Sequence, residues 1–87
     1  MDEKKILNGI KKFNRYRSPE AKAELLSLNS HSFTVKITGI FSTTCGFYDY
    51  FEDLKIFLEE EGLKVKIEKV TEIEKGAIIR YKIANTS

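Results

Sequence analysis

Apolar residues recur at helical spacing in two stretches of this chain and alternate with polar residues in several shorter ones. In the first helical stretch, Asp2–Tyr16, every third or fourth residue is apolar, which predicts an amphipathic helix. The buried stripe would consist of Ile6, Leu7, Ile10, Phe13 and Tyr16. This helix should stop near Ser18, because the residue before Pro19 is pushed out of the helical region.

A second helix is predicted to begin around Gly46 or Phe47. Its apolar residues fall on one face at helical spacing and are Phe47, Tyr50, Phe51, Leu54, Phe57 and Leu58. Gly62 is well placed to end this helix, since glycine readily adopts the left-handed conformation that closes many helices.

Residues 20–28 fit two different elements. Ser18 and Pro19 favour a short helix, as its N-cap and first residue. The strict alternation of charged and apolar residues suits a half-buried strand instead. We prefer the strand, because Asn29–Ser32 would then form a hairpin turn into the alternating, β-branched run Phe33–Gly39.

Two further alternating runs, Leu63–Glu68 and Ala77–Ile83, are joined around Glu74–Gly76 and predict a second hairpin. The element order is then α-ββ-α-ββ, in a single domain that covers residues 1–87. We expect an α+β fold, namely a two-layer sandwich in which two helices cover one face of a four-stranded antiparallel sheet.

The net charge of +2 conceals two oppositely charged helices. Six cations and two acids give residues 1–17 a net charge of +4, whereas six acids and one lysine give residues 49–61 a net charge of −5. A basic helix of this kind is a candidate for binding phosphate groups. Its candidate nucleic-acid-binding residues are Lys4, Lys5, Lys11, Lys12 and Arg15.

The predicted sheet would add further cations if the apolar side of each strand faces the helices. The cations on the other side would be Lys22, Lys36, Lys64, Lys66, Arg80 and Lys82. Glu20, Glu24 and Glu68 would offset half of this charge. No aromatic residue falls in the outward register, where it could stack on a base. Nucleic-acid binding would therefore be weak, directed at the phosphate backbone and sensitive to salt.

Three apolar side chains outside the predicted core, Phe41, Tyr48 and Ile56, favour an interaction surface for a protein partner or for a second copy of the chain. The opposite charges of the two helices would support such pairing between chains. Alternatively, they would flank each other within one chain, where exposed ion pairs contribute little. Our leading expectation is a non-enzymatic binding module that acts through a protein–protein or self-association surface, with nucleic-acid binding as the alternative.

Cys45 carries a second alternative, a thiol-dependent enzyme. The predicted helix N-terminus after Cys45 would lower the pKa of its thiol, but Asp49, Glu52 and Asp53 would raise this pKa again. His31, the only histidine, lies beyond a predicted strand about 26 Å long and is too distant to act as the base. We therefore expect Cys45 to be a packing residue, and we predict no catalytic residue.

The remaining sequence features argue against other classes of protein. One cysteine and one histidine do not make a zinc site, and no phosphate-binding loop or dinucleotide motif is present, so we expect no metal and no cofactor. No apolar run is long enough to span a membrane, and the N-terminus lacks the apolar run of a secretory signal. A single cysteine fits a reducing compartment. These features predict a cytoplasmic protein that does not bind membranes.

The run Thr43–Asp53 (TTCGFYDYFED), placed between two predicted hairpins, resembles small uncharacterised α+β protein families of archaea. This resemblance implies the same fold, and it implies no named activity. The absence of glutamine and tryptophan, together with many lysines and glutamates, is typical of thermophilic proteins. We therefore expect a thermophilic source.

Overall fold

The computed structural model describes residues 2–17, 21–39 and 47–84, with only the backbone described for residues 2 and 47–49. Its elements are α1 (Asp2–Arg17), β1 (Ala21–Leu28), β2 (Ser32–Gly39), α2 (Phe47–Glu60), β3 (Val65–Ile73) and β4 (Gly76–Ile83). The order α-ββ-α-ββ is the predicted one. The prediction of an α+β fold with a four-stranded antiparallel sheet is confirmed.

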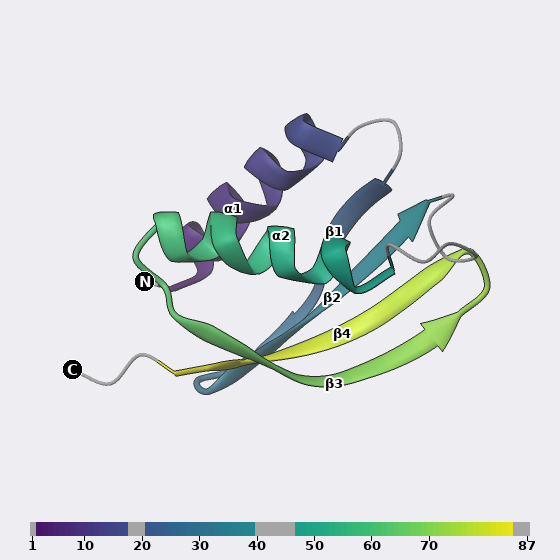
Figure 1. The fold of residues 1–87 in the computed structure, drawn as a ribbon. Coiled ribbons are helices and arrows are strands. Elements are labelled where there is room, and N and C mark those ends of the chain that lie inside the picture. Colours follow the sequence, from purple (N-terminus) through teal and green to yellow (C-terminus); the bar gives the residue numbers. More distant parts are fainter. Residues whose placement is uncertain (1, 18–20, 40–46, 85–87) are drawn as a thin grey trace.

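The strand order in the sheet is β1-β2-β4-β3, so the two hairpins are joined by the pairing of β2 with β4. Both helices lie on the same face of this sheet, and the opposite face is left open (Figure 1). The open question about residues 20–28 is resolved for the described part, because Ala21–Leu28 form a strand. In the turn that follows, the side-chain oxygen of Asn29 accepts hydrogen bonds from the backbone N–H groups of His31 (3.0 Å) and Ser32 (2.9 Å).

The hydrophobic core fills the space between the helices and the sheet. Its fully buried large side chains are Ile6 and Phe13 from α1, Phe51, Leu54 and Leu58 from α2, Phe33, Val35 and Ile37 from β2, and Ile79 and Tyr81 from β4, together with Leu63. Tyr81 stacks on Phe33 with ring centroids 5.2 Å apart. Its hydroxyl group donates a hydrogen bond to the backbone oxygen of Phe51 at 2.9 Å, so the polar end of this buried ring has a partner.

The predicted buried stripe of α1 is too wide by two residues. Leu7 is 47% exposed and Tyr16 is 65% exposed, whereas Ile6, Ile10 and Phe13 are buried as predicted. Residues on the flanks of a helical stripe are buried only if a neighbouring element covers them. The contacts of α1 with α2 on one side and β1 on the other cover the centre of the stripe and leave these two flanking side chains open.

The two helices pack closely against each other where α1 has a glycine. A Cβ atom at Gly9 would lie 2.7 Å from the Cδ2 atom of Leu58 and 3.4 Å from its Cα atom. A larger residue would therefore push the helices apart. Helix α2 ends at Glu60, and Gly62 closes it as predicted. Gly62 has a φ of 90°, and its N–H donates to Glu59 O at 2.9 Å while Leu63 N–H donates to Leu58 O at 3.0 Å. This is the Schellman pattern of helix termination.

The edge of the sheet at β1 is tied to α1 by a single side chain. The Oδ1 atom of Asn14 accepts a hydrogen bond from the backbone N–H of Ala23 at 2.6 Å, and its Nδ2 atom donates to the backbone oxygen of the same residue at 3.1 Å. The amide of Asn14 thus takes the place that a neighbouring strand would occupy at this position.

Strand β3 is longer than predicted and contains a β-bulge. The prediction ended it at Glu68, but the strand continues to Ile73, with a register shift between Ile67 and Lys69. The alternation of apolar and polar residues breaks there, because Glu68 and Lys69 are consecutive polar residues. The extra residue in the bulge restores the alternation, so Lys69 pairs with Arg80 on the open face.

Candidate nucleic-acid interface

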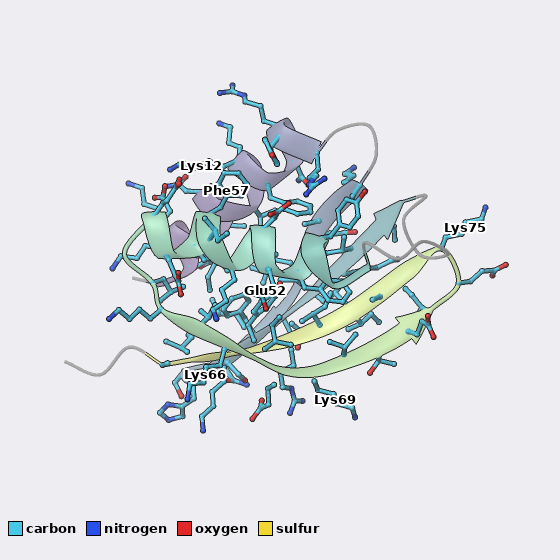
Figure 2. All side chains as sticks on the ribbon, viewed as in Figure 1. Lys12, Glu52, Phe57, Lys66, Lys69 and Lys75 are labelled. Atoms are coloured by element: carbon cyan, nitrogen blue, oxygen red, sulfur yellow. The ribbon has the colours of Figure 1, made fainter. Side chains whose placement is uncertain are left out.

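The open face of the sheet gathers cations from all four strands. Its described cations are Lys22, Lys36, Lys66, Lys69, Arg80 and Lys82. Lys66 and Lys69 project from the sheet on the side away from the helices (Figure 2). The acids among the described strand residues of this face are Glu24 and the exposed bulge residue Glu68, which gives six cations against two acids, a net charge of +4.

Five of these six cations were predicted for this face, and Lys69 was not. Lys64 was also predicted here; it is exposed and immediately precedes β3, where its backbone oxygen accepts a hydrogen bond from Ala84 N–H at 2.8 Å. Glu20, predicted to offset part of the charge, lies outside the described residues. The signal for Lys69 was present in the sequence, because two consecutive polar residues between Ile67 and Val70 mark a break in alternation.

The cations form a diagonal across the sheet. Residues paired across the strands form rungs that run across the sheet, and the cations occupy four successive rungs. The order is Lys66 with Lys82, Lys69 with Arg80, Lys36, and Lys22. Successive rungs on one face are about 6.7 Å apart and neighbouring strands about 4.8 Å apart, so the steps from Arg80 to Lys36 and from Lys36 to Lys22, which also change strand, are about 8 Å each. The result is a basic track from β3 to β1, which we call the basic diagonal; at its β1 end Glu24 is the cross-strand partner of Lys36 and offsets part of the charge.

A hollow of about 140 Å³ lies in the middle of the basic diagonal and is lined by Thr34, Lys69, Thr71, Ile78 and Arg80. Arg80 of β4 lies between two cross-strand partners, Thr34 on β2 and Lys69 on β3. The residues that line the hollow therefore carry two hydroxyl groups, an ammonium group and a guanidinium group, around a half-buried isoleucine. In the described part of the chain, neither Lys69 nor Arg80 has an ion pair or a side-chain hydrogen bond.

In the helix layer, by contrast, two cations of α1, Lys12 and Arg17, form ion pairs with acids in or just after α2. Lys12 contacts Glu61 at 2.6 Å and Glu60 at 3.8 Å, and Figure 2 shows Lys12 in the helix layer. The hydrogen bond to Glu61 raises the pKa of Lys12, and the same bond lowers the pKa of Glu61. Arg17 binds the carboxylate of Asp53 through its Nε atom at 2.8 Å and through a terminal nitrogen.

The predicted nucleic-acid-binding residues of α1 are therefore not equivalent. Lys12 is paired with acids of the helix layer, and Lys5 is half-buried. Lys4, Lys11 and Arg15 are exposed. They belong to the layer that covers the other face of the sheet (Figure 1), so they cannot extend the basic diagonal.

The predicted interaction surface is described only in part. Ile56 is 52% exposed, as expected, whereas Phe41 and the side chain of Tyr48 lie outside the described residues. An exposed aromatic residue that the sequence analysis placed in the core lies in the same layer. Tyr16 packs edge-to-face on Phe57, which follows Ile56, with ring centroids 5.6 Å apart.

Arg17 fixes the aromatic side chains at this end of the helix pair. Its guanidinium carbon lies 4.4 Å from the ring centroid of Tyr50 and 5.2 Å from that of Tyr16, within the range of a cation–π interaction. Together with the Asp53 contact, these interactions hold Arg17 in place as part of the helix layer.

The residues considered for catalysis do not come together in the described structure. Cys45 lies outside the described residues. His31 is exposed in the β1–β2 turn, Glu52 is exposed, and Asp53 is bound to Arg17. Among the residues that the structure describes, no group of three or more histidine, cysteine, aspartate or glutamate residues is placed to hold a metal ion.

Burial raises the pKa of Tyr81, and the negative charge of Glu52 raises it further. The hydroxyl group of Tyr81 is already bonded to the backbone of α2, so this shift reflects a structural role in the core.

No helix in the described part of the chain is both long enough and apolar enough to cross a membrane. Comparison of the chain with protein-family models, with curated proteins and with solved structures gave no match.

Proposed function

We propose that this protein is a non-enzymatic binding domain that holds single-stranded nucleic acid on the open face of its sheet. The observation that carries the proposal is the basic diagonal, a track of six cations on a face whose net charge is positive. At its centre, Lys69 and Arg80 have no ion pair with any described residue. A linear series of cations matches the linear charge of a phosphate backbone. A cytoplasmic location would give it access to such ligands.

The composition of the face favours contact with the backbone over recognition of bases. The aromatic residues of the described strands, Phe33 and Tyr81, are buried in the core on the other side of the sheet. Stacking on bases therefore does not contribute, and binding should tolerate any sequence. With four to six phosphate contacts on a single strand, affinity should fall by about 50- to 300-fold between ~50 and ~200 mM salt.

The experiment is a fluorescence-anisotropy titration of short RNA and DNA strands with the protein and two charge-reversed variants. The sheet variant carries Lys36→Glu and Lys82→Glu, and the matched control carries Lys4→Glu and Lys11→Glu, which are exposed on the helix layer. Both variants change the net charge by the same amount. We expect the sheet variant to lose nearly all binding at low salt, and the control to keep most of it.

Two results would contradict the proposal. One is an equal loss in both variants, which would mean that only the net charge matters. The other is an acidic peptide of matched charge that binds as tightly as the oligonucleotides, which would identify an acidic protein as the partner of this face.

A protein partner for the helix layer is the second candidate function, and it rests on a different observation. Ile56 and Tyr16 are exposed on the outside of the helix layer, and aromatic residues and arginine are enriched at the energetic centres of interfaces. Sedimentation at two protein concentrations tests the self-association form of this proposal. A concentration-dependent mass that Ile56→Lys abolishes would support it, and a constant monomer mass would exclude a homodimer.

A further inference from the structure

We propose that the hollow lined by Thr34, Lys69, Thr71, Ile78 and Arg80 is the anchor site of the open face, and that it holds one internal phosphate group of the bound strand. This inference rests on the proposed function and assigns unequal roles to the cations of the basic diagonal. Those in the hollow would bind one phosphate with defined geometry, whereas the others would attract the strand as point charges.

The first argument is the convergence of donors. Lys69, Arg80 and Thr34 are direct neighbours on three adjacent strands, and Thr71 lies one rung further along β3, paired with Ile78. Guanidinium, ammonium and hydroxyl groups all donate hydrogen bonds to phosphate oxygens, and the planar guanidinium group can donate two in parallel. The lining of the hollow thus offers a phosphate group more donors than any other part of the open face.

The second argument is that these donors are not already used. Within the described chain, Lys69 and Arg80 have no ion pair, whereas Lys12 and Arg17 of the helix layer do. The hollow's volume of about 140 Å³ exceeds the ~30 Å³ that one water molecule takes in the liquid. The hollow is thus larger than a single-water site and is open to a ligand from solvent.

The third argument decides which phosphate is bound. The basic diagonal continues on both sides of the hollow, to Lys66 and Lys82 in one direction and to Lys36 and Lys22 in the other. If the hollow held a terminal phosphate, the strand would extend in one direction only, and the cations on the other side of the hollow would contact no phosphate. A strand that passes through the hollow contacts the cations on both sides of it, so the anchored phosphate is an internal phosphodiester.

The test uses substitutions that change donor geometry but not charge. Arg80→Lys keeps the positive charge and removes the planar pair of donors. We expect about a tenfold loss of oligonucleotide affinity with an unchanged salt slope, because a hydrogen bond to a charged group is lost. Arg15→Lys on the exposed face of α1 is the matched control and should change affinity less than twofold.

A second pair of variants isolates the hydroxyl groups. Thr34→Val should weaken binding about fivefold, while Thr38→Val, on the same strand and the same face but outside the hollow, should have almost no effect. Valine is at least as compatible with a strand as threonine, so both variants should fold, and circular dichroism spectra would verify this.

The outcomes separate the anchor from the proposed function. If the unmodified protein binds no oligonucleotide at low salt, both proposals fail. If binding occurs and Lys36→Gln and Lys82→Gln weaken it, but Arg80→Lys and Thr34→Val act like their controls, the proposed function stands and the anchor is wrong. Strands with and without a 5′-phosphate should bind equally. A gain from the 5′-phosphate that Arg80→Lys removes would overturn the assignment to an internal phosphate.

Discussion

At the scale of single residues, Gly9 decides how closely the two helices approach. A Cβ atom there would lie 2.7 Å from the Cδ2 atom of Leu58, a side chain with no exposed surface. We expect Gly9→Ala to lower the free energy of unfolding by up to about 2 kcal/mol. Overpacking costs about 1–3 kcal/mol, and the better helix propensity of alanine recovers about 1 kcal/mol of this loss.

Urea denaturation of a double-mutant cycle would check this explanation. In a Leu58→Ala background the clash is absent, so Gly9→Ala should become neutral or stabilising. If Gly9→Ala were equally destabilising in both backgrounds, the close contact with Leu58 would not be its cause.

Lys12 and Glu61 give the helix layer a defined pH dependence. The hydrogen bond from Lys12 lowers the pKa of Glu61 below its ordinary value of 4.5. A carboxyl group with a lowered pKa in the folded state stabilises the fold above its unfolded pKa and loses this contribution as the pH falls through the folded pKa. We expect Lys12→Met to destabilise the protein at neutral pH but not in acid, below the folded pKa of Glu61.

An NMR titration of the Glu61 carboxyl group is the direct measurement. Its midpoint should rise in Lys12→Met, and it should not move in the control Lys11→Met, whose side chain lies elsewhere on α1. An unchanged midpoint in Lys12→Met would show that the ion pair does not form in solution.

At the scale of elements, the turn between β3 and β4 contains two adjacent positions that both favour glycine, and only the second of them, Gly76, is a glycine. Lys75 has a φ of 67°, a conformation that glycine adopts without strain, so Lys75→Gly should stabilise the protein by up to about 1 kcal/mol. A Cβ atom at Gly76 would lie 2.2 Å from the backbone oxygen of Ile37. Gly76→Ala should therefore cost about 3 kcal/mol, because β2 and β4 would have to separate.

Thermal unfolding of these two variants would test both predictions together. Opposite shifts of the melting temperature are expected from adjacent positions. A negligible effect of Gly76→Ala would mean that the β2–β4 contact is looser at this end than the structure shows.

The sequence was sufficient for the helices and for the first hairpin, since their periodicities are long or are supported by a local turn. The β1–β2 turn depends on Asn29, whose side chain bonds to residues two and three positions ahead, and such local chemistry is visible in a sequence. The extent of β3 was missed because the bulge at Glu68 interrupts the alternation. Without the bulge, Lys69 could not be assigned to the open face.

The candidate site was predictable as a set of cations but not as an arrangement. Alternation alone indicated that Lys36, Arg80 and their neighbours share one face. The hollow depends in addition on the pairing of β2 with β4, which brings Thr34 opposite Arg80 although the two residues are far apart in the chain. No local pattern fixes a register between strands of different hairpins, so this part required the structure.

At the scale of the whole molecule, the two layers differ in how their charges are compensated. In the helix layer, Asp53, Glu60 and Glu61 bind two cations of α1, Lys12 and Arg17, whereas the cations of the open face outnumber its acids. If the proposed function is correct, an oligonucleotide at 100 times its dissociation constant should stabilise the fold by about 2.7 kcal/mol. For a domain of this size, the melting temperature should rise by roughly 10–20 °C.

Calorimetry or dye-monitored melting with and without oligonucleotide would measure this shift. The sheet variant with Lys36→Glu and Lys82→Glu should show almost none of it, and the helix-layer control should show most of it. A similar shift in both variants would place the ligand elsewhere on the molecule.

The bond between Asn14 and Ala23 has a consequence for the behaviour of the protein at high concentration. An unpaired edge strand is a template on which further strands of other molecules can add, which is a common start of aggregation. Because the amide of Asn14 occupies both backbone groups of Ala23, another chain cannot continue the sheet past this point. Growth of fibres from β1 is thereby restricted to its second half, where the bulge between Leu25 and Ser27 already bends the edge.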